Sequence, residues 1–233
     1  MDIKVFPQFN NIVAGFTTKP DDSDQRRAAM VLDNPNSYII RPRQVHGNDV
    51  LPITPEMLGK KHYIEIPAMD GLVTNLKGVR LTTTHGDCLP VYGVDPSKGV
   101  IGLAHAGWKG TALMIAQKLI EAMASTYNCQ PKDIQCFIGP GIDKCHFEFG
   151  LKEAEEHFFA PNSSTRAFIA KELPEGKILL DLKGINKHFL MNAGVPEENI
   201  EVSPECTYCD VEKFYSYRRC KDTKRMLAYI EMI

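Results

Sequence analysis

The chain has 233 residues, of which 43% are hydrophobic and 24% are charged, and its formal net charge is -2. This apolar content supports a sizeable buried core, and the near-neutral charge gives no electrostatic footprint for nucleic acid or an anionic membrane. The first residues lack the apolar core of a signal peptide, and no apolar run approaches the roughly 18–20 residues of a membrane span. We therefore expect a soluble cytoplasmic protein.

Cysteines are numerous for a chain without a secretion signal. Their number is odd and their spacing is irregular, which argues against a disulfide framework. Most of them are expected to be small buried hydrophobic residues, and at least one to be a metal ligand or a nucleophile. The seven are Cys88, Cys129, Cys136, Cys145, Cys206, Cys209 and Cys220.

Several short apolar segments predict β-strands. In residues 79–84, apolar and polar side chains alternate, which is typical of a half-buried strand. Residues 100–104 are continuously apolar, which favours a fully buried strand. Further strands are predicted at residues 89–94, 136–138, 178–182 and 226–230.

The clearest predicted helix begins near Thr111. Thr111 can cap it, and Gly107 and Gly110 allow a tight entry turn. Further helices are predicted at residues 151–159 and 185–193. Apolar side chains recur three and four residues apart in the first helix, as on one helical face, at Leu113, Ala116, Ile120, Met123 and Tyr127.

The order of these elements indicates the fold class. Strands and helices mix without a regular βαβ rhythm, which favours an α+β protein. Residues 160–176 are rich in Pro, Asn, Ser and Gly, which predicts a surface connection, and we expect residues 1–233 to form a single domain. Neither the dinucleotide-binding pattern GxGxxG nor the P-loop pattern occurs in the chain.

Three short segments carry residues suited to chemistry at predicted strand ends. They are Gln44-Val45-His46-Gly47, Gly86-Asp87-Cys88-Leu89-Pro90 and His105-Ala106-Gly107-Trp108-Lys109-Gly110. Cys88 and His105 flank one strand–turn–strand unit, whose pairing could bring them close. One thiolate and two imidazoles suit zinc, and three protein ligands leave a fourth position for water or substrate. From spacing alone this signal is weak, because a lone histidine is usually a core or surface residue rather than a ligand.

The chain resembles the YfiH-like family, whose members are labelled polyphenol oxidase, laccase domain or purine nucleoside phosphorylase. The resemblance rests on the three segments above, on Asp70-Gly71-Leu72-Val73-Thr74 between the first two, and on later segments around Ile138-Gly139-Pro140-Gly141-Ile142, Cys145-His146-Phe147-Glu148-Phe149-Gly150 and Tyr215-Ser216-Tyr217-Arg218-Arg219. It covers the chain from about Gln44 to the C-terminus.

The resemblance implies a layered α/β/β/α sandwich of mixed sheets and one zinc ion bound by His46, Cys88 and His105. It also implies phosphorolysis of adenosine, inosine and methylthioadenosine to free base and ribose 1-phosphate, with adenosine deamination as a side activity. The chain departs from the family near its start. Phe16-Thr17-Thr18-Lys19 runs into a polar stretch without the usual glycine loop, and Lys19 replaces an arginine.

A phosphorolytic site needs cations for the phosphate. We predict this role for Arg43, Arg218, Arg219 and Lys19, with Arg218 also counted as catalytic. The alternative is a solvated basic face that also includes Lys221, Lys224 and Arg225.

Three further residues receive predicted roles. Asp87 is predicted to orient a histidine or to act in acid–base catalysis, and Glu148 to relay a proton. Trp108 is predicted to stack on the purine, with core packing as the alternative. His146 is expected to be structural, and Cys206 and Cys209 to be ordinary reduced cysteines, because no second Cys-x-x-Cys pair accompanies them.

Three other functions compete with this prediction. Cys88, His105 and Asp87 could form the nucleophile, base and orienting group of a cysteine hydrolase. A copper-dependent polyphenol oxidase needs many paired histidines, whereas this chain has seven histidines and no His-x-His, although Cu²⁺ can replace Zn²⁺ at a single site. A non-enzymatic binding module would require the three ligands to lie far apart.

Overall fold

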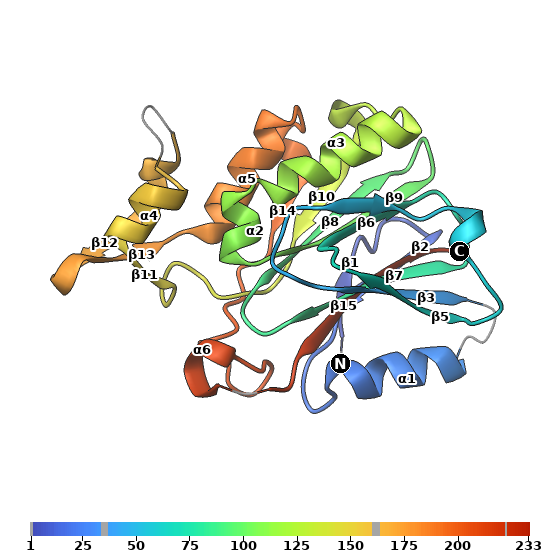
Figure 1. Ribbon diagram of the computed structural model, residues 1–233, viewed down its shortest axis with the longest axis horizontal. Coiled ribbons are helices and arrows are strands. Elements are labelled where there is room, and N and C mark those ends of the chain that lie inside the picture. The colour runs from blue at the N-terminus through green and yellow to red at the C-terminus, as the bar shows by residue number, and fades with distance from the viewer. Residues whose placement is uncertain (1, 34–36, 160–163, 222) are drawn as a thin grey trace.

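The computed structural model describes residues 2–33, 37–159, 164–221 and 223–233. Two six-stranded sheets pack face to face, and helices cover both outer faces (Figure 1). Each sheet contains parallel and antiparallel neighbours. The predicted α+β class with an α/β/β/α sandwich of mixed sheets is therefore confirmed.

The first sheet brings the N-terminal strands next to the last strand of the chain. β3 pairs in parallel with β7 and β5, and the other neighbours are antiparallel. In spatial order the strands are β1 (Ile3–Val5), β2 (Ile12–Phe16), β15 (Met226–Met232), β7 (Val79–His85), β3 (Tyr38–Arg43) and β5 (Tyr63–Pro67).

The second sheet contains the hairpin that carries the central motifs. β8 and β9 are antiparallel neighbours at its centre, and parallel pairs lie at its two edges. In spatial order the strands are β14 (Ile200–Val202), β10 (Gln135–Ile138), β8 (Leu89–Asp95), β9 (Val100–Ala106), β6 (Gly71–Thr74) and β4 (Val50–Pro52).

A small antiparallel sheet and α4 project from one end of the sandwich (Figure 1). This sheet consists of β11 (Glu148–Gly150), β13 (Lys177–Leu180) and β12 (Ile169–Leu173). The α-helices are α1 (Ser23–Asp33), α2 (Trp108–Ala112), α3 (Ile115–Tyr127), α4 (Leu151–His157), α5 (Leu182–Asn192) and α6 (Tyr217–Cys220). Short 3₁₀ turns lie at Pro55–Met57, Pro131–Asp133, Ser164–Phe168, Pro174–Gly176 and Glu197–Asn199.

Burial of apolar side chains between the layers holds the sandwich together. One cluster fills the space between the two sheets and includes Phe16, Leu81 and Tyr92. A second lies between the second sheet and α3 and α5, and a third joins Met30 of α1 to the first sheet. Because both faces of the first sheet are covered, β7 is buried along most of its length, and the prediction of a half-buried strand was wrong.

The predicted helix from Thr111 is broken in two. Met114 has a left-handed backbone, with φ of 62°, which ends α2 and starts α3. Thr111 therefore caps nothing. It is buried inside α2, where its hydroxyl accepts a hydrogen bond of 2.9 Å from Asn186 Nδ2. Leu113, predicted on the apolar face, is 48% exposed at the break.

Other boundaries also differ from the predictions. Residues 160–163 of the predicted surface connection lie outside the described residues, and the rest includes β12 and two 3₁₀ turns rather than a simple loop. The strand predicted at residues 178–182 ends at Leu180, because Asp181 caps α5 by accepting from the Gly184 N–H at 2.8 Å. The predicted helices at 151–159 and 185–193 are confirmed as α4 and α5, with shifted ends.

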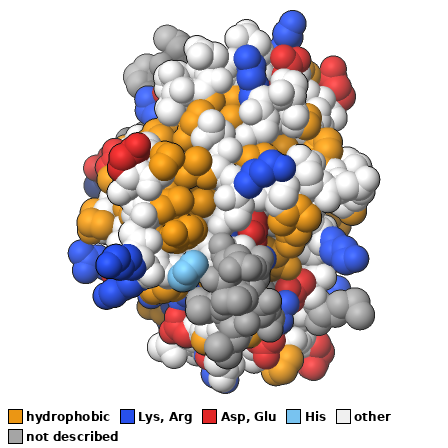
Figure 2. All heavy atoms as spheres, turned by 90° about the vertical axis from the view of Figure 1, so that its right-hand side faces the viewer, with side chains coloured by type: hydrophobic (Ala, Val, Ile, Leu, Met, Phe, Trp, Pro, Cys, Tyr) orange, Lys and Arg blue, Asp and Glu red, His pale blue; other side chains and the backbone are white. Residues whose placement is uncertain are grey.

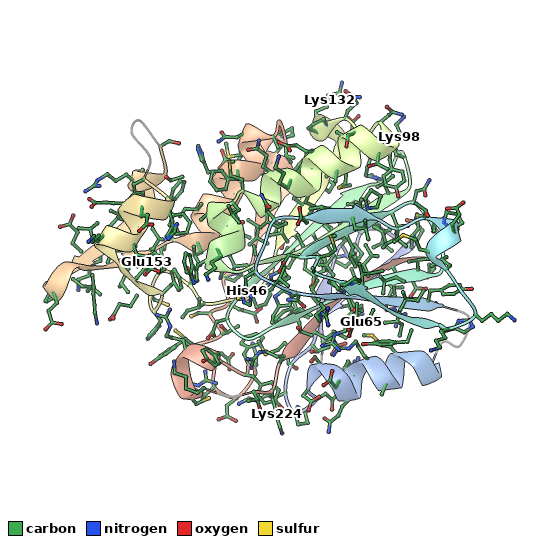
Figure 3. All side chains as sticks on the ribbon, viewed as in Figure 1. His46, Glu65, Lys98, Lys132, Glu153 and Lys224 are labelled. Carbon is green, nitrogen blue, oxygen red and sulfur yellow. The ribbon has the colours of Figure 1, made fainter. Side chains whose placement is uncertain are left out.

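Figure 2 shows the end of the sandwich that lies at the right of Figure 1, where hydrophobic side chains gather in two areas between scattered Lys and Arg side chains. Figure 3, which has the same view as Figure 1, shows His46 in the left half of the molecule, away from this end. Within the described part of the chain, no helix combines the length and apolar character that crossing a membrane requires.

Candidate metal centre and pocket

The structure brings His46, Cys88 and His105 together from three separate segments. One ligand-type atom from each lies within 4.8 Å of the others. The antiparallel pairing of β8 and β9 sets Pro90 opposite His105, which places Cys88 beside that histidine as expected. His46 follows β3 of the other sheet, so the group forms where the two sheets meet, near α2 and α6 (Figure 3).

Asp70 orients two of the three side chains. Its buried carboxylate accepts hydrogen bonds from the N–H groups of Val45, His46 and Gly47 at 2.8–3.0 Å, which sets the backbone of the His46 turn. It also lies 2.8 Å from Nδ1 of His105, which directs Nε2 of that ring away from the carboxylate. Burial alone raises the pKa of Asp70, but these hydrogen bonds outweigh it and the pKa lies below its usual value.

The site favours a cysteine thiolate. Burial raises the pKa of the Cys88 thiol, but His105 and His46 outweigh that effect and bring the pKa to about 6. Burial lowers the pKa of His105, whereas Cys88 and Asp70 raise it to about 9. Because the thiolate is the form of cysteine that binds metals and acts as a nucleophile, this environment suits either role.

Neighbouring polar side chains hold the two turns in place. The Gln44 amide donates to the Thr84 carbonyl at 2.9 Å and accepts from the Thr84 N–H at 2.8 Å. Nδ1 of buried His85 donates to the Cys88 carbonyl at 3.0 Å, so its Nε2 accepts from the Thr83 hydroxyl at 2.8 Å. Burial, followed by the nearby His105, lowers the pKa of His85 well below its usual value, which keeps this ring neutral.

Gly107 leaves room for the ligand side chains. A Cβ at this position would lie 2.9 Å from His46 Cδ2 and 3.1 Å from Cys88 Sγ, so the two side chains would have to move apart. We expect Gly107→Ala to weaken metal binding by roughly 10- to 100-fold, as changes next to metal ligands commonly do. Competition with a chelator measures the effect. Gly59→Ala is the control, because a Cβ there meets no atom within 4 Å, and equal losses in both variants would contradict the prediction.

The three side chains face a pocket of about 580 Å³. This volume lies within the range of roughly 300–1,000 Å³ typical of small-molecule sites. One part of the wall is apolar and another is cationic. The wall includes Gln44, Thr84, Gly86, Asp87, Trp108, Ile142, Phe147, Leu182, Tyr217, Arg218, Lys221 and Arg225.

Asp87 links the pocket to α6. Its carboxylate accepts from the Thr207 hydroxyl at 2.7 Å and from the Arg218 N–H at 2.6 Å. The predicted hydrolase set of Cys88, His105 and Asp87 is wrong in its third member, because Asp70 rather than Asp87 contacts the His105 ring. Asp87 borders the pocket as predicted, and its hydrogen bonds are those of a positioning group.

Only one of the four predicted phosphate-binding cations reaches the pocket. Arg218 lines it, with its guanidinium 5.2 Å from the Phe147 ring centre and donating to the Glu148 carbonyl at 2.8 Å. Arg43 is the last residue of β3, three residues before His46, but it is not part of the pocket wall. The Lys19 ammonium instead donates to the Val211 carbonyl at 2.8 Å, which connects the N-terminal segment to a loop that is distant in sequence.

Arg219 has a structural position, contrary to its predicted role. Its guanidinium donates at 2.8 Å to three backbone carbonyls, those of Thr207, Tyr208 and Phe214. Lys221 and Arg225 line the pocket instead, and both had been assigned to the alternative of a solvated basic face. Helical position explains the difference between Arg218 and Arg219, since adjacent residues point to different sides of α6.

Of the remaining predicted residues, Trp108 lines the pocket and Glu148 does not. Trp108 packs against Phe149, with ring centres 5.1 Å apart, as the packing alternative expects, and it also lines the pocket, where stacking on a purine stays a prediction. The Glu148 side chain forms an exposed ion pair with Lys177 at 2.7 Å and does not line the pocket, which does not fit a proton relay. Asp70 received no predicted role, although a carboxylate just before a buried strand was a signal for one.

Comparison with known proteins identifies the family. The model of the family described as multi-copper polyphenol oxidoreductase laccase matches residues 15–233. The chain is 34% identical to "Purine nucleoside phosphorylase YlmD" of Geobacillus stearothermophilus, over 96% of this chain and 91% of that protein. It is 32% identical to "Adenosine deaminase RL5" of an unknown prokaryotic organism, over 82% of this chain and 73% of that protein.

A solved structure agrees with these matches. The crystal structure of the Bacillus licheniformis hypothetical protein YfiH superposes with a TM-score of 0.87 at 29% identity, covering 96% of this chain and 94% of that one. The similarity therefore extends over the layered sheets as well as the motifs. The chain belongs to the family described as multi-copper polyphenol oxidoreductase laccase, which includes the YfiH and YlmD proteins.

Proposed function

We propose that this chain is a zinc-dependent enzyme that processes purine nucleosides, by phosphorolysis of adenosine, inosine and methylthioadenosine and, secondarily, by deamination of adenosine. The observation that carries the proposal is one pocket that combines the His46, Cys88 and His105 group with cations and aromatic rings. The names of the relatives, purine nucleoside phosphorylase and adenosine deaminase, support the same substrate class.

The donor set fits zinc. Two imidazoles and one thiolate are ligands that zinc accepts, and three protein ligands are the number typical of catalytic zinc sites. The close approach of Gly107 to His46 and Cys88 leaves the space that such a group requires. When bound, zinc supplies Lewis acidity and lowers the pKa of water. Asp70 would orient the ligands toward the ion and keep His105 in the tautomer that presents Nε2.

The cationic wall suits a phosphate. In phosphorolysis a phosphate oxygen forms a bond to the sugar carbon C1′ while the bond from C1′ to the base nitrogen breaks. Arg218, Lys221 and Arg225 can hold the phosphate dianion and stabilise its charge during this transfer. Apolar contact from Trp108 and Phe147 can hold the flat purine. In deamination a water oxygen adds at C6 of adenine and ammonia leaves.

The test is product analysis with and without phosphate. Adenosine or inosine is incubated with the full chain, and base, ribose 1-phosphate and inosine are separated by chromatography. We expect release of base that depends on phosphate, together with loss of activity and of one equivalent of zinc in Cys88→Ser and His46→Ala. A zinc-loaded chain that releases no base and deaminates no adenosine would refute the proposal.

Arg218→Ala tests the phosphate site. We expect the KM for phosphate to rise by roughly 10- to 100-fold, because a hydrogen bond to a charged group contributes about 1.5–3 kcal/mol. Arg43→Ala removes a cation outside the pocket wall and serves as the control. Initial rates at varied phosphate and saturating inosine give the KM for phosphate of both variants. An unchanged KM in Arg218→Ala would contradict the role of Arg218 in phosphate binding.

A cysteine hydrolase remains the second candidate, with Asp70 in place of Asp87. Cys88, His105 and Asp70 have the order of a nucleophile, a base and an orienting carboxylate, and the low pKa of Cys88 suits a nucleophile. The position of His46 beside the Cys88 thiol favours a metal site over a hydrolase site, because a cysteine hydrolase does not need a second imidazole there. Stoichiometric zinc that protects Cys88 from alkylation would decide against the hydrolase.

Copper oxidation fits the residues less well. Among the described residues, two clusters have the ligands for a metal ion, and neither contains more than two histidines. A single cysteine with two histidines also occurs in blue-copper sites, which add a distant methionine or glutamine. Among the residues that the structure describes, no methionine lines this pocket, and the Gln44 amide is hydrogen-bonded to Thr84. Copper can replace zinc in vitro, because Cu²⁺ generally binds such ligands more tightly.

A further inference from the structure

A second cluster of metal-ligand side chains lies outside the pocket wall. Cys145 and His146 belong to the loop between β10 and β11, and Cys206 and Cys209 belong to the loop that follows β14. One ligand-type atom from each of the four lies within 4.8 Å of the others. The sequence predicts Cys206 and Cys209 to be ordinary reduced cysteines because no second Cys-x-x-Cys pair is present. Cys145 and His146, which complete the cluster, lie far from them in sequence.

Three distances within the cluster, those among Cys145, His146 and Cys209, lie within about 0.4 Å of the edges of a tetrahedron around zinc. Zinc bonds of about 2.3 Å to sulfur and 2.0–2.1 Å to nitrogen give edges of about 3.8 Å between two sulfurs and about 3.6 Å between sulfur and nitrogen. Cys145 Sγ and Cys209 Sγ are 3.6 Å apart, and His146 Nδ1 lies 3.2 Å and 3.3 Å from them. A disulfide requires about 2.05 Å between sulfurs, so these atoms are placed for a shared ligand rather than for that bond.

We propose that Cys145, His146, Cys206 and Cys209 bind a second, structural zinc ion. Three thiolates and one imidazole are a common set for structural zinc, and four protein ligands leave no open position for substrate. The set is also softer than the pocket group, which disfavours magnesium, calcium and manganese. This assignment goes beyond the proposed function and does not depend on it.

Groups around the cluster support the ligands. The Asp143 N–H donates to Cys206 Sγ at 3.4 Å, and the His146 ring stacks on Tyr208 with centres 4.2 Å apart. Backbone N–H groups directed at a cysteine sulfur and a packed ligand ring are the outer contacts that metal sites commonly have.

The second site would join two loops that build the pocket. Cys206 bridges to Gly141, and the Thr207 N–H donates to the Gly141 carbonyl at 3.1 Å. The same loop presents the Thr207 hydroxyl to Asp87 and two carbonyls to Arg219. The structural ion would thus hold the base of α6, and with it Arg218, at the edge of the pocket.

Metal content of the full chain tests the proposal. After purification under reducing conditions and dialysis against metal-free buffer, we expect close to two equivalents of zinc per chain. Cys88→Ser and the double variant Cys145→Ser/Cys209→Ser should each retain close to one. Cys220→Ser removes an exposed cysteine outside both clusters and should retain two. One equivalent in the unmodified chain that disappears in Cys88→Ser would overturn the proposal.

Cobalt gives a second measurement that does not depend on the double variant folding. In Cys88→Ser loaded with Co²⁺, the remaining ion should show the strong visible bands of tetrahedral cobalt and the near-ultraviolet charge transfer of several thiolates. Weak bands of six-coordinate cobalt, or a disulfide between Cys145 and Cys209 in freshly reduced protein by mass spectrometry, would exclude the site. Because inosine plays no part in either measurement, failure of the proposed function leaves this result unaffected.

Discussion

Replacing Asp70 with alanine is expected to weaken metal binding in the pocket by roughly 10- to 100-fold and to lower the free energy of unfolding by about 3–5 kcal/mol. Both effects come from one carboxylate, which accepts from three consecutive N–H groups around His46 and contacts the His105 ring. Its removal frees the His46 turn and leaves His105 without its orienting partner. Chelator competition and urea unfolding measure the two effects.

Asp95→Ala is the matched control for this prediction. Asp95 is also fully buried, and it accepts from Ser97 and Lys98 within a local turn far from the pocket group. We expect it to lower stability while leaving metal affinity unchanged. If both variants lost metal to the same extent, general destabilisation would explain the loss and the assigned role of Asp70 would be wrong.

Replacing Asp87 should separate a positioning role from an acid–base role. Alanine removes the contacts to Thr207 and to the backbone N–H of Arg218, so α6 loses two of the contacts that hold it beside the pocket. We expect kcat/KM to fall by about 100-fold, as a displacement of about 1 Å at a reacting site can produce. The measurement is steady-state phosphorolysis of inosine.

Asparagine distinguishes the two roles of Asp87. Its amide oxygen can accept from the Arg218 N–H, and its amide nitrogen can donate to the Thr207 hydroxyl, which can reverse direction. A positioning role therefore predicts that Asp87→Asn keeps most of the activity that Asp87→Ala loses, with an unchanged pH profile. Loss of activity in both variants to the same degree would support direct proton transfer by Asp87.

Hydrophobic pattern and motifs anticipated much of the structure. The strands predicted at 89–94 and 100–104 and the helices predicted at 151–159 and 185–193 are present, because the local residue pattern reflects local burial. The break at Met114 could not be anticipated, because neither glycine nor proline marks it and a left-handed backbone there depends on packing. The burial of β7 on both faces likewise depends on α1 and the second sheet.

The motifs predicted the pocket group better than the other site residues. Three segments that resemble a known family carry the thiol and imidazole groups of His46, Cys88 and His105, and the structure brings these groups together. Cations carry no comparable signal, because arginine and lysine occur over most protein surfaces. The direction in which each side chain leaves α6 therefore determines its role. Arg218 faces the pocket, whereas Arg219 donates to backbone carbonyls.

Residue pattern alone predicts the α+β class and most of the strands and helices, because apolar periodicity reflects local burial. The trio His46, Cys88 and His105 came from the resemblance of three segments to a known family, since spacing alone did not mark them as ligands. The contacts of Asp70, the cations that line the pocket and the meeting of Cys145 and His146 with Cys206 and Cys209 became visible only in the packed fold. Each of these joins residues distant in sequence, and such contacts exist only after the layers and loops have packed.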